Sequence, residues 1–299
     1  MRNPQHKEKR TVPGRQTKVY GVLAGLCLTA FAVLAVLAAG SFFHKAEAKK
    51  EFAALQEETA VPEAGTGGME DTGKAKGTKD TEISPEGEQN TSGYAPLPED
   101  AAIPEKELDF GKLTAEVNEH IYAWIYIPGT LVDYPIVRHP TEESYYLNRN
   151  LDGSSGYPGC IYVDPVNTAD FSDPNTVIYG HNMKDDSMFG SLHEYRDRQF
   201  FDGNRYLYIY TPEKTLVYEI FAAYEYSDIH LIYSFDLSNP EIFQIYLDQI
   251  FEIRDMTANI RDDREVTADD RIVTLSTCIG GKDTMRYLVQ GVLIYEQEQ

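Results

Sequence analysis

Cys278 is the residue of this sequence best placed to act as a nucleophile. It ends the strand-like run 271–278 and is followed by Ile279, Gly280 and Gly281. A side chain at a strand end beside a glycine loop can be rigidly held and still be reached by substrate. A cysteine attacks as its thiolate, so it needs a neighbouring base or cation.

A histidine is the expected base, and five histidines follow residue 44: His120, His139, His181, His193 and His230. His181 has the most informative position, because it follows the strand-like run 175–179 and a glycine. Like Cys278, it would sit where a strand ends, so neighbouring strands could bring the two side chains together. The alternative for a lone histidine at a strand end is an ordinary surface residue.

Arg286 is the candidate cation. It opens the strand that follows Cys278, and in a β-meander that strand returns alongside the previous one. Arg286 could then face Cys278, favour its thiolate and stabilise an oxyanion. An ordinary surface arginine is the competing interpretation.

The other cysteine of this region, Cys160, begins a different strand-like run. Burial statistics favour a small core residue at such a position. A disulfide between Cys160 and Cys278 would block the nucleophile, so we expect both thiols to be free.

Strand signals dominate after residue 105. Short runs rich in β-branched and aromatic residues predict strands, and helical spacing or caps predict three helices. The predicted strands cover 123–127, 134–138, 160–163, 176–179, 205–210, 215–226, 271–276 and 287–295, and the helices cover 108–121, 188–195 and 239–253. The pattern indicates a mainly β domain with helices, a barrel or a sandwich, over residues 105–299.

The net charge of −21 is unevenly distributed and excludes a nucleic-acid partner. Residues 1–18 carry a net charge of +5, and residues 19–43 carry none. A 25-residue uncharged run is long enough for a transmembrane helix, and its basic flank predicts a cytoplasmic N-terminus with the remainder outside. A cleaved signal peptide ending at residues 46–48 is the alternative, but its apolar core would be shorter.

Residues 44–104 predict an acidic, flexible stalk. Between residues 61 and 94 large apolar side chains are almost absent, so this part cannot bury enough surface to offset the cost of ordering it. The predicted domain over 105–299 would therefore be spaced from the membrane.

The motifs around the three candidate residues resemble those of sortases, the membrane-anchored cysteine transpeptidases of Gram-positive bacteria. Residues 274–278 match the TLxTC signature, and the order histidine, cysteine, arginine also agrees. Residues 123–130, 133–137, 145–148, 159–164, 179–183 and 286–291 are similar to further sortase segments. The N-terminal helix and the long helix before the cysteine strand point to class B, and the resemblance covers about 108–296.

The resemblance implies an eight-stranded sortase-like β-barrel and a role for each residue. Cys278 would attack the carbonyl that follows threonine in a C-terminal sorting signal, and His181 would act as general acid and base. Arg286 would hold the substrate backbone and the oxyanion, while Ser276 and Thr277 would line the substrate groove. An amine of a peptidoglycan precursor or a pilin would resolve the thioester.

Surface proteins bearing a sorting signal are thus the expected partners, and we expect no cofactor and no metal. Ile279 departs from many class B sortases, which have an acidic residue after the nucleophile. Two alternatives remain at this stage: another exported cysteine enzyme such as an L,D-transpeptidase, and a surface binding module without catalysis. The first is disfavoured because Ser276 and Thr277 replace the histidine and glycine of its signature.

Overall fold

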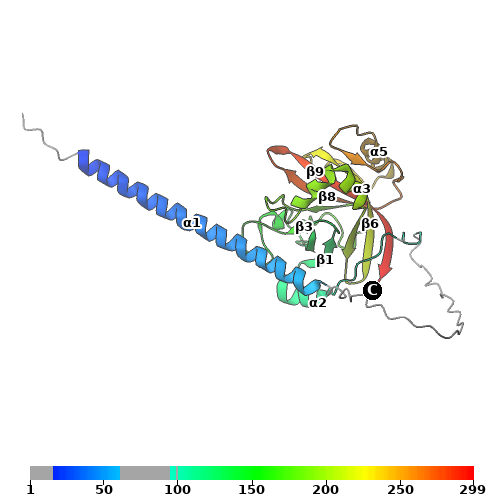
Figure 1. The fold of residues 1–299 in the computed structure, drawn as a ribbon, viewed down its shortest axis with the longest axis horizontal. Coiled ribbons are helices and arrows are strands. Elements are labelled where there is room, and N and C mark those ends of the chain that lie inside the picture. The colour runs from blue at the N-terminus through cyan, green and yellow to red at the C-terminus, as the bar shows by residue number, and fades with distance from the viewer. Residues whose placement is uncertain (1–15, 61–94, 99) are drawn as a thin grey trace, which may run out of the picture. The chain divides into compact units, whose positions relative to one another are not determined.

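The computed structural model describes residues 16–60, 95–98 and 100–299 (Figure 1). The chain divides into two compact units, Met1–Glu47 and Ala48–Gln299, and helix α1, Gln16–Thr59, has residues in both. Residues 1–15 of the predicted basic tail, and residues 61–94 and 99 of the predicted stalk, lie outside the described part of the chain.

The uncharged run 19–43 lies within α1. Among the described residues, no helix has the length and apolar character that crossing a bilayer requires. The transmembrane helix over 19–43 stays a prediction from the sequence.

One sheet builds the second unit. Among the described residues its nine strands are ordered β5-β1-β2-β3-β4-β8-β9-β6-β7, and pairing of β5 with β6 closes eight of them into a barrel (Figure 1). The strands are β1 Ile121–Tyr126, β2 Asp133–Val137, β3 Ile161–Val163, β4 Asn175–Tyr179, β5 Tyr206–Tyr210, β6 Lys214–Ser227, β7 Asn259–Ile260, β8 Ile272–Ile279 and β9 Lys282–Glu298. The mainly β fold with eight barrel strands is confirmed, and closure decides for the barrel over the sandwich.

Helices and single turns connect the strands. They are α2 Phe110–Lys112, η1 Leu113–Val117, η2 Tyr145–Asn148, η3 Gly190–Arg196, α3 Arg198–Gly203, α4 Leu231–Ser234 and α5 Pro240–Phe251. The predicted long helix agrees with α5, which Asn239 caps by accepting a hydrogen bond from the Glu241 amide. The run predicted as a helix over 188–195 forms the 3₁₀ turn η3 instead.

The helix predicted over 108–121 is shorter than expected and ends at Val117. Asn118 adopts an extended backbone, and its side chain accepts from the His120 amide and donates to the Leu151 carbonyl. Asparagine side chains compete in this way with helical hydrogen bonds, so the chain turns directly into β1.

The last turns of α1 pack against the barrel within the second unit. Phe52 is 4% exposed and meets the Tyr134 ring edge to face, with 5.4 Å between ring centroids. Gln56 donates to the Asp133 carbonyl at 2.7 Å, and Lys49 forms an ion pair with Asp185 at 2.8 Å. Residues 48–59 are thus continuous with the core of the barrel.

A buried polar network ties together the strands at the centre of the barrel. Gln290 on β9 is fully buried, donates to Thr274 on β8 and to Tyr246 on α5, and accepts from Tyr224 on β6. Thr274 donates in turn to Asn175 on β4. These side-chain bonds link β4, β8 and β9 in one register, and Nδ2 of Asn175 is the atom of this network left without a hydrogen-bond partner among the described residues.

Candidate functional site

Cys278 is the penultimate residue of β8 and the only exposed residue among the eight of that strand. Its neighbours Thr277 and Ile279 are 2% and 6% exposed. The thiol is free. A rigid, buried strand therefore presents one accessible sulfur at its end.

Arg286 lies directly opposite Cys278 in the antiparallel pairing of β8 and β9. Its Nη1 donates to the carbonyls of Asp283 and Met285, both at 3.0 Å. These bonds hold one nitrogen of the guanidinium against the β8–β9 turn. Its Nε and Nη2 form no hydrogen bond with the described residues, so the planar fork keeps donors for an anion.

His181 follows β4, which runs parallel to β8 with Tyr179 beside Ser276. The Gly180 amide donates to the Ser276 carbonyl at 3.2 Å, and this bond extends the pairing by one residue. His181 therefore leaves the sheet level with Cys278, one residue before the end of β8. The topology brings the predicted histidine, cysteine and arginine to one end of three adjacent strands.

The tautomer of His181 follows from its hydrogen bond. Nε2 lies 2.6 Å from the Leu147 carbonyl oxygen, which can only accept, so Nε2 carries the proton and Nδ1 is the acceptor of the neutral ring. Burial lowers the pKa of this imidazole, and the bond to Leu147 only partly offsets the effect. The ring also contacts Tyr157 at a centroid distance of 4.8 Å.

A cavity of about 390 Å³ joins these side chains. Cys278, His181 and Arg286 all line it, as do Ser276 and Thr277, the two residues predicted to contact substrate. The rest of its lining comes from Ser144, Leu147, Asn148, Tyr157, Tyr162, Val177, Tyr179, Gly180, residues 226–231 and Leu288. The volume lies in the range of small-ligand sites.

His230 also lines this cavity, a position that the sequence did not distinguish from those of the other histidines. Its Nε2 is 3.2 Å from a carboxylate oxygen of the buried Asp164 and 3.1 Å from the Tyr179 hydroxyl. His120 and His139 lie elsewhere, in ring contact with each other and with Tyr145 or Tyr146.

Cys160 is 1% exposed, and its thiol donates to the Arg149 carbonyl at 3.2 Å. Burial raises the pKa of this thiol well above its usual value, which makes it a poor nucleophile. Cys160 is thus a small core residue, as predicted, and both Cys160 and Cys278 are free thiols.

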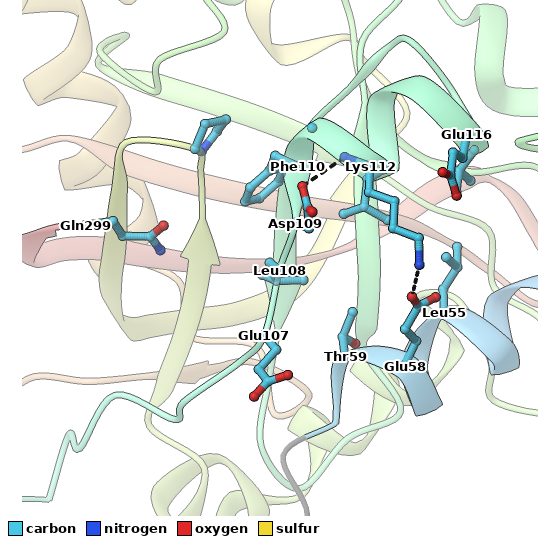
Figure 2. A pocket seen from close by; sticks show the side chains of 14 residues that line it. Leu55, Glu58, Thr59, Glu107, Leu108, Asp109, Phe110, Lys112, Glu116 and Gln299 are labelled. Atoms are coloured by element: carbon cyan, nitrogen blue, oxygen red, sulfur yellow. Dashed lines mark hydrogen bonds and ion pairs between the residues drawn. The ribbon is translucent and has the colours of Figure 1, made fainter.

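A larger cavity, of about 920 Å³, lies between the end of α1 and α2. Figure 2 shows Lys112 reaching Glu58 of α1, while Asp109 accepts a hydrogen bond from the Lys112 amide at 2.9 Å. Its lining includes Glu107, Glu116 and Gln299 but no cysteine or histidine. The nucleophile is therefore confined to the smaller cavity.

The bonds around Leu147, Asn182 and His193 were not predicted. Leu147 takes part through its main-chain carbonyl, which has no signature in a sequence. Asn182 and His193 both donate to the Cys278 carbonyl, at 3.0 and 3.1 Å. Asn182 follows His181 directly in the sequence, and this adjacency was the one sign that Asn182 would lie near the site.

Comparison with known proteins agrees with this geometry. The Sortase domain family model matches residues 125–294, more than half of the chain. Sortase B of Listeria monocytogenes is 34% identical over 181 residues, which are 60% of this chain and 72% of that protein. Two solved structures are similar as well.

The Bacillus anthracis sortase B in complex with AAEK2 has 35% identity and a TM-score of 0.55, covering 62% of this chain and 83% of that chain. The Staphylococcus aureus sortase B–substrate complex has 29% identity and a TM-score of 0.54, covering 62% of this chain and 84% of that chain. The family model and these relatives all carry the name sortase, and the relatives named here are sortase B proteins. The chain belongs to the sortase family of cysteine transpeptidases, and its relatives place it in class B.

Proposed function

We propose that this sortase cleaves a C-terminal sorting signal after threonine and transfers the acyl group to an amine of the cell wall or of a pilin. The observation that supports this most directly is the pairing of Cys278 with Arg286, while His181 leaves the neighbouring strand into the same cavity. Family membership as a transpeptidase sets aside the L,D-transpeptidase and the binding module considered from the sequence.

In the first half-reaction the Cys278 thiol loses its proton and its sulfur attacks the carbonyl carbon that follows threonine. His181 Nδ1 is the acceptor for that proton, because Nε2 is already committed to the Leu147 carbonyl. The same proton passes to the amine that leaves when the peptide bond breaks. A thioester between Cys278 and the threonine carbonyl remains.

Arg286 stabilises the negative charge that develops on the carbonyl oxygen. It is held by the two bonds from Nη1, so Nε and Nη2 can bind the oxyanion with little loss of side-chain freedom.

In the second half-reaction an amine attacks the thioester, His181 takes the amine's proton, and the Cys278 sulfur leaves and is reprotonated. The S. aureus sortase B structure is a complex with a substrate, and the donor proposed for this chain is a peptide that carries a sorting signal. Ser276 and Thr277 would contact that peptide, since both line the cavity beside the nucleophile.

Membrane attachment belongs to this proposal and rests on the sequence alone. The uncharged run 19–43 and the basic flank 1–18 would place the N-terminus in the cytoplasm and the catalytic domain, 105–299, outside the cell on its stalk, 44–104. Protease treatment of intact cells that express a chain tagged at each end tests this topology. Loss of the N-terminal tag would overturn it.

The test of the reaction uses the full-length chain in lipid vesicles, a library of peptides with threonine at the cleavage position, and triglycine as the amine. Mass spectrometry should detect a thioester on Cys278 and a ligated product. Cys278→Ala should abolish both, whereas Cys160→Ala, the matched control, should retain turnover. Absence of product with every peptide, or undiminished turnover by Cys278→Ala, would refute the proposal.

A further inference from the structure

The main-chain carbonyl of Cys278 receives two side-chain hydrogen bonds. Asn182 donates from Nδ2 at 3.0 Å, and His193 donates from Nε2 at 3.1 Å. The two donors come from different places, the segment after β4 and the turn η3. They converge on the residue that carries the exposed thiol.

Because β4 ends early, side chains rather than main-chain amides donate to the Cys278 carbonyl. In a parallel pair, alternate carbonyls of one strand face the same neighbour. The Ser276 carbonyl faces β4 and accepts from the Gly180 amide, so the Cys278 carbonyl faces the same side two residues later. No β4 amide reaches it, because β4 ends at Tyr179.

On its other side, the register of β8 with β9 shifts between Cys278 and Ile279. The backbone ladder is therefore interrupted immediately after Cys278 on both edges of β8, and on the β9 side it resumes with Ile279 opposite Lys282. Without Asn182 and His193, the Cys278 carbonyl would have no hydrogen-bond donor on the β4 side.

Both donors are themselves held in place. The Phe189 amide donates to the His181 carbonyl at 3.0 Å, and Asn182 is bridged to Met188, so the segment 181–189 closes on itself. The His193 ring packs on Tyr287 with 4.9 Å between centroids. Burial lowers the pKa of His193, so the ring is neutral at neutral pH, with its proton on the nitrogen that donates.

We propose that Asn182 and His193 are positioning residues, which replace the missing β4 amide and fix the orientation of the Cys278 sulfur toward His181 and Arg286. This inference rests on the proposed role of Cys278 as nucleophile. A small displacement of a nucleophile can reduce the reaction rate by about 100-fold. Two hydrogen bonds that hold the carbonyl of the nucleophilic residue can therefore influence the rate of thioester formation.

The test compares isosteric variants of the full-length chain. His193→Leu and Asn182→Asp, which remove a donor each, should lower kcat for thioester formation by about tenfold each, with little change in KM. His193→Gln should restore most of the rate, because its amide nitrogen occupies nearly the position of Nε2. Glu194→Ala, at the exposed next residue of η3, is the matched control and should retain the wild-type kcat.

Hydrogen exchange of residues 276–281 separates this inference from the proposed function. Exchange there should accelerate in His193→Leu and Asn182→Asp and return to normal in His193→Gln, at an unchanged Tm. Wild-type kcat in both donor-less variants would overturn the inference, as would failure of glutamine to rescue. If the wild-type chain transfers no peptide, the proposed function fails. Independently of that result, unchanged hydrogen exchange in both variants would show that Asn182 and His193 do not hold the Cys278 carbonyl.

Discussion

His181 Nε2 and the main-chain oxygen of Leu147 are 2.6 Å apart, although the two residues are separated by 34 positions in the sequence. This bond determines which nitrogen of the imidazole carries the proton. Because Nδ1 is left as the acceptor, the direction of proton transfer at the site depends on a carbonyl in the turn η2.

Gly159 lies directly against the Leu147 carbonyl, and replacing this glycine should impair catalysis. A Cβ atom at residue 159 would lie 2.5 Å from the Leu147 oxygen, so Gly159→Ala must displace it. We expect kcat to fall by about tenfold or more. Gly153→Ala is the matched control, because Gly153 also has a positive φ but its Cβ would meet nothing within 4 Å. Both variants share a backbone strain of about 1 kcal/mol, so an equal loss of kcat in both would contradict the role of Leu147.

Stability should decrease as the pH falls below the ordinary pKa of histidine. The pKa values of His181 and His193 are lowered in the folded state, so the unfolded chain binds more protons between the folded and unfolded pKa values. Their contribution is fully present above the unfolded pKa and is lost as pH falls through the folded pKa. Urea midpoints measured at about pH 7.5 and about pH 5 check this. The double variant His181→Gln, His193→Gln should show a smaller difference, and an equal difference would exclude these two groups.

Arg286→Lys should not preserve activity. A lysine ammonium can replace the charge but not the planar fork, which bonds two carbonyls from Nη1 and leaves Nε and Nη2 for the oxyanion. We expect kcat to fall by about 100-fold. Arg198→Lys, at an exposed ion pair with Asp202, should retain the wild-type rate. Wild-type kcat in Arg286→Lys would show that charge alone suffices.

Gln290→Leu should destabilise the barrel. The substitution removes the acceptor of the buried Tyr224 hydroxyl and the donor to Tyr246 and Thr274, while Thr274 keeps its own bond to Asn175. We expect a loss of about 2 kcal/mol in the free energy of unfolding, measured by urea denaturation. Gln199→Leu, at an exposed position of α3, should change it by less than about 0.5 kcal/mol. An unchanged free energy in Gln290→Leu would mean that the network contributes nothing to stability.

Phe52→Ala should destabilise the barrel even though Phe52 belongs to α1. Its side chain is buried against Tyr134, and the substitution leaves a cavity there. We expect a loss of about 3 kcal/mol in the free energy of unfolding. Glu57→Ala, on the exposed side of the same helix, is the matched control. If both variants unfold at the wild-type urea concentration, residues 48–59 do not stabilise the barrel.

Much of the fold was predictable because its signals are local. The strands follow from runs of β-branched and aromatic residues, and α5 follows from its Asn239 cap and Pro240. The hairpin of β5 and β6 follows from two such runs separated by a short turn that contains proline. The helix before β1 was predicted too long because the side chain of Asn118 competes with the helical backbone.

The residue types of the candidate site were also determined by the sequence, since cysteine, histidine and arginine at strand ends differ chemically from their neighbours. The tertiary structure decided what holds them: the Leu147 carbonyl on His181, and Asn182 and His193 on the Cys278 carbonyl. Every residue has a carbonyl, so composition and spacing cannot show which one accepts a given bond. Asn182 and His193 are 96 and 85 positions from Cys278 in the sequence, and the segment after β4 reaches Cys278 only because β4 lies beside β8 in the sheet.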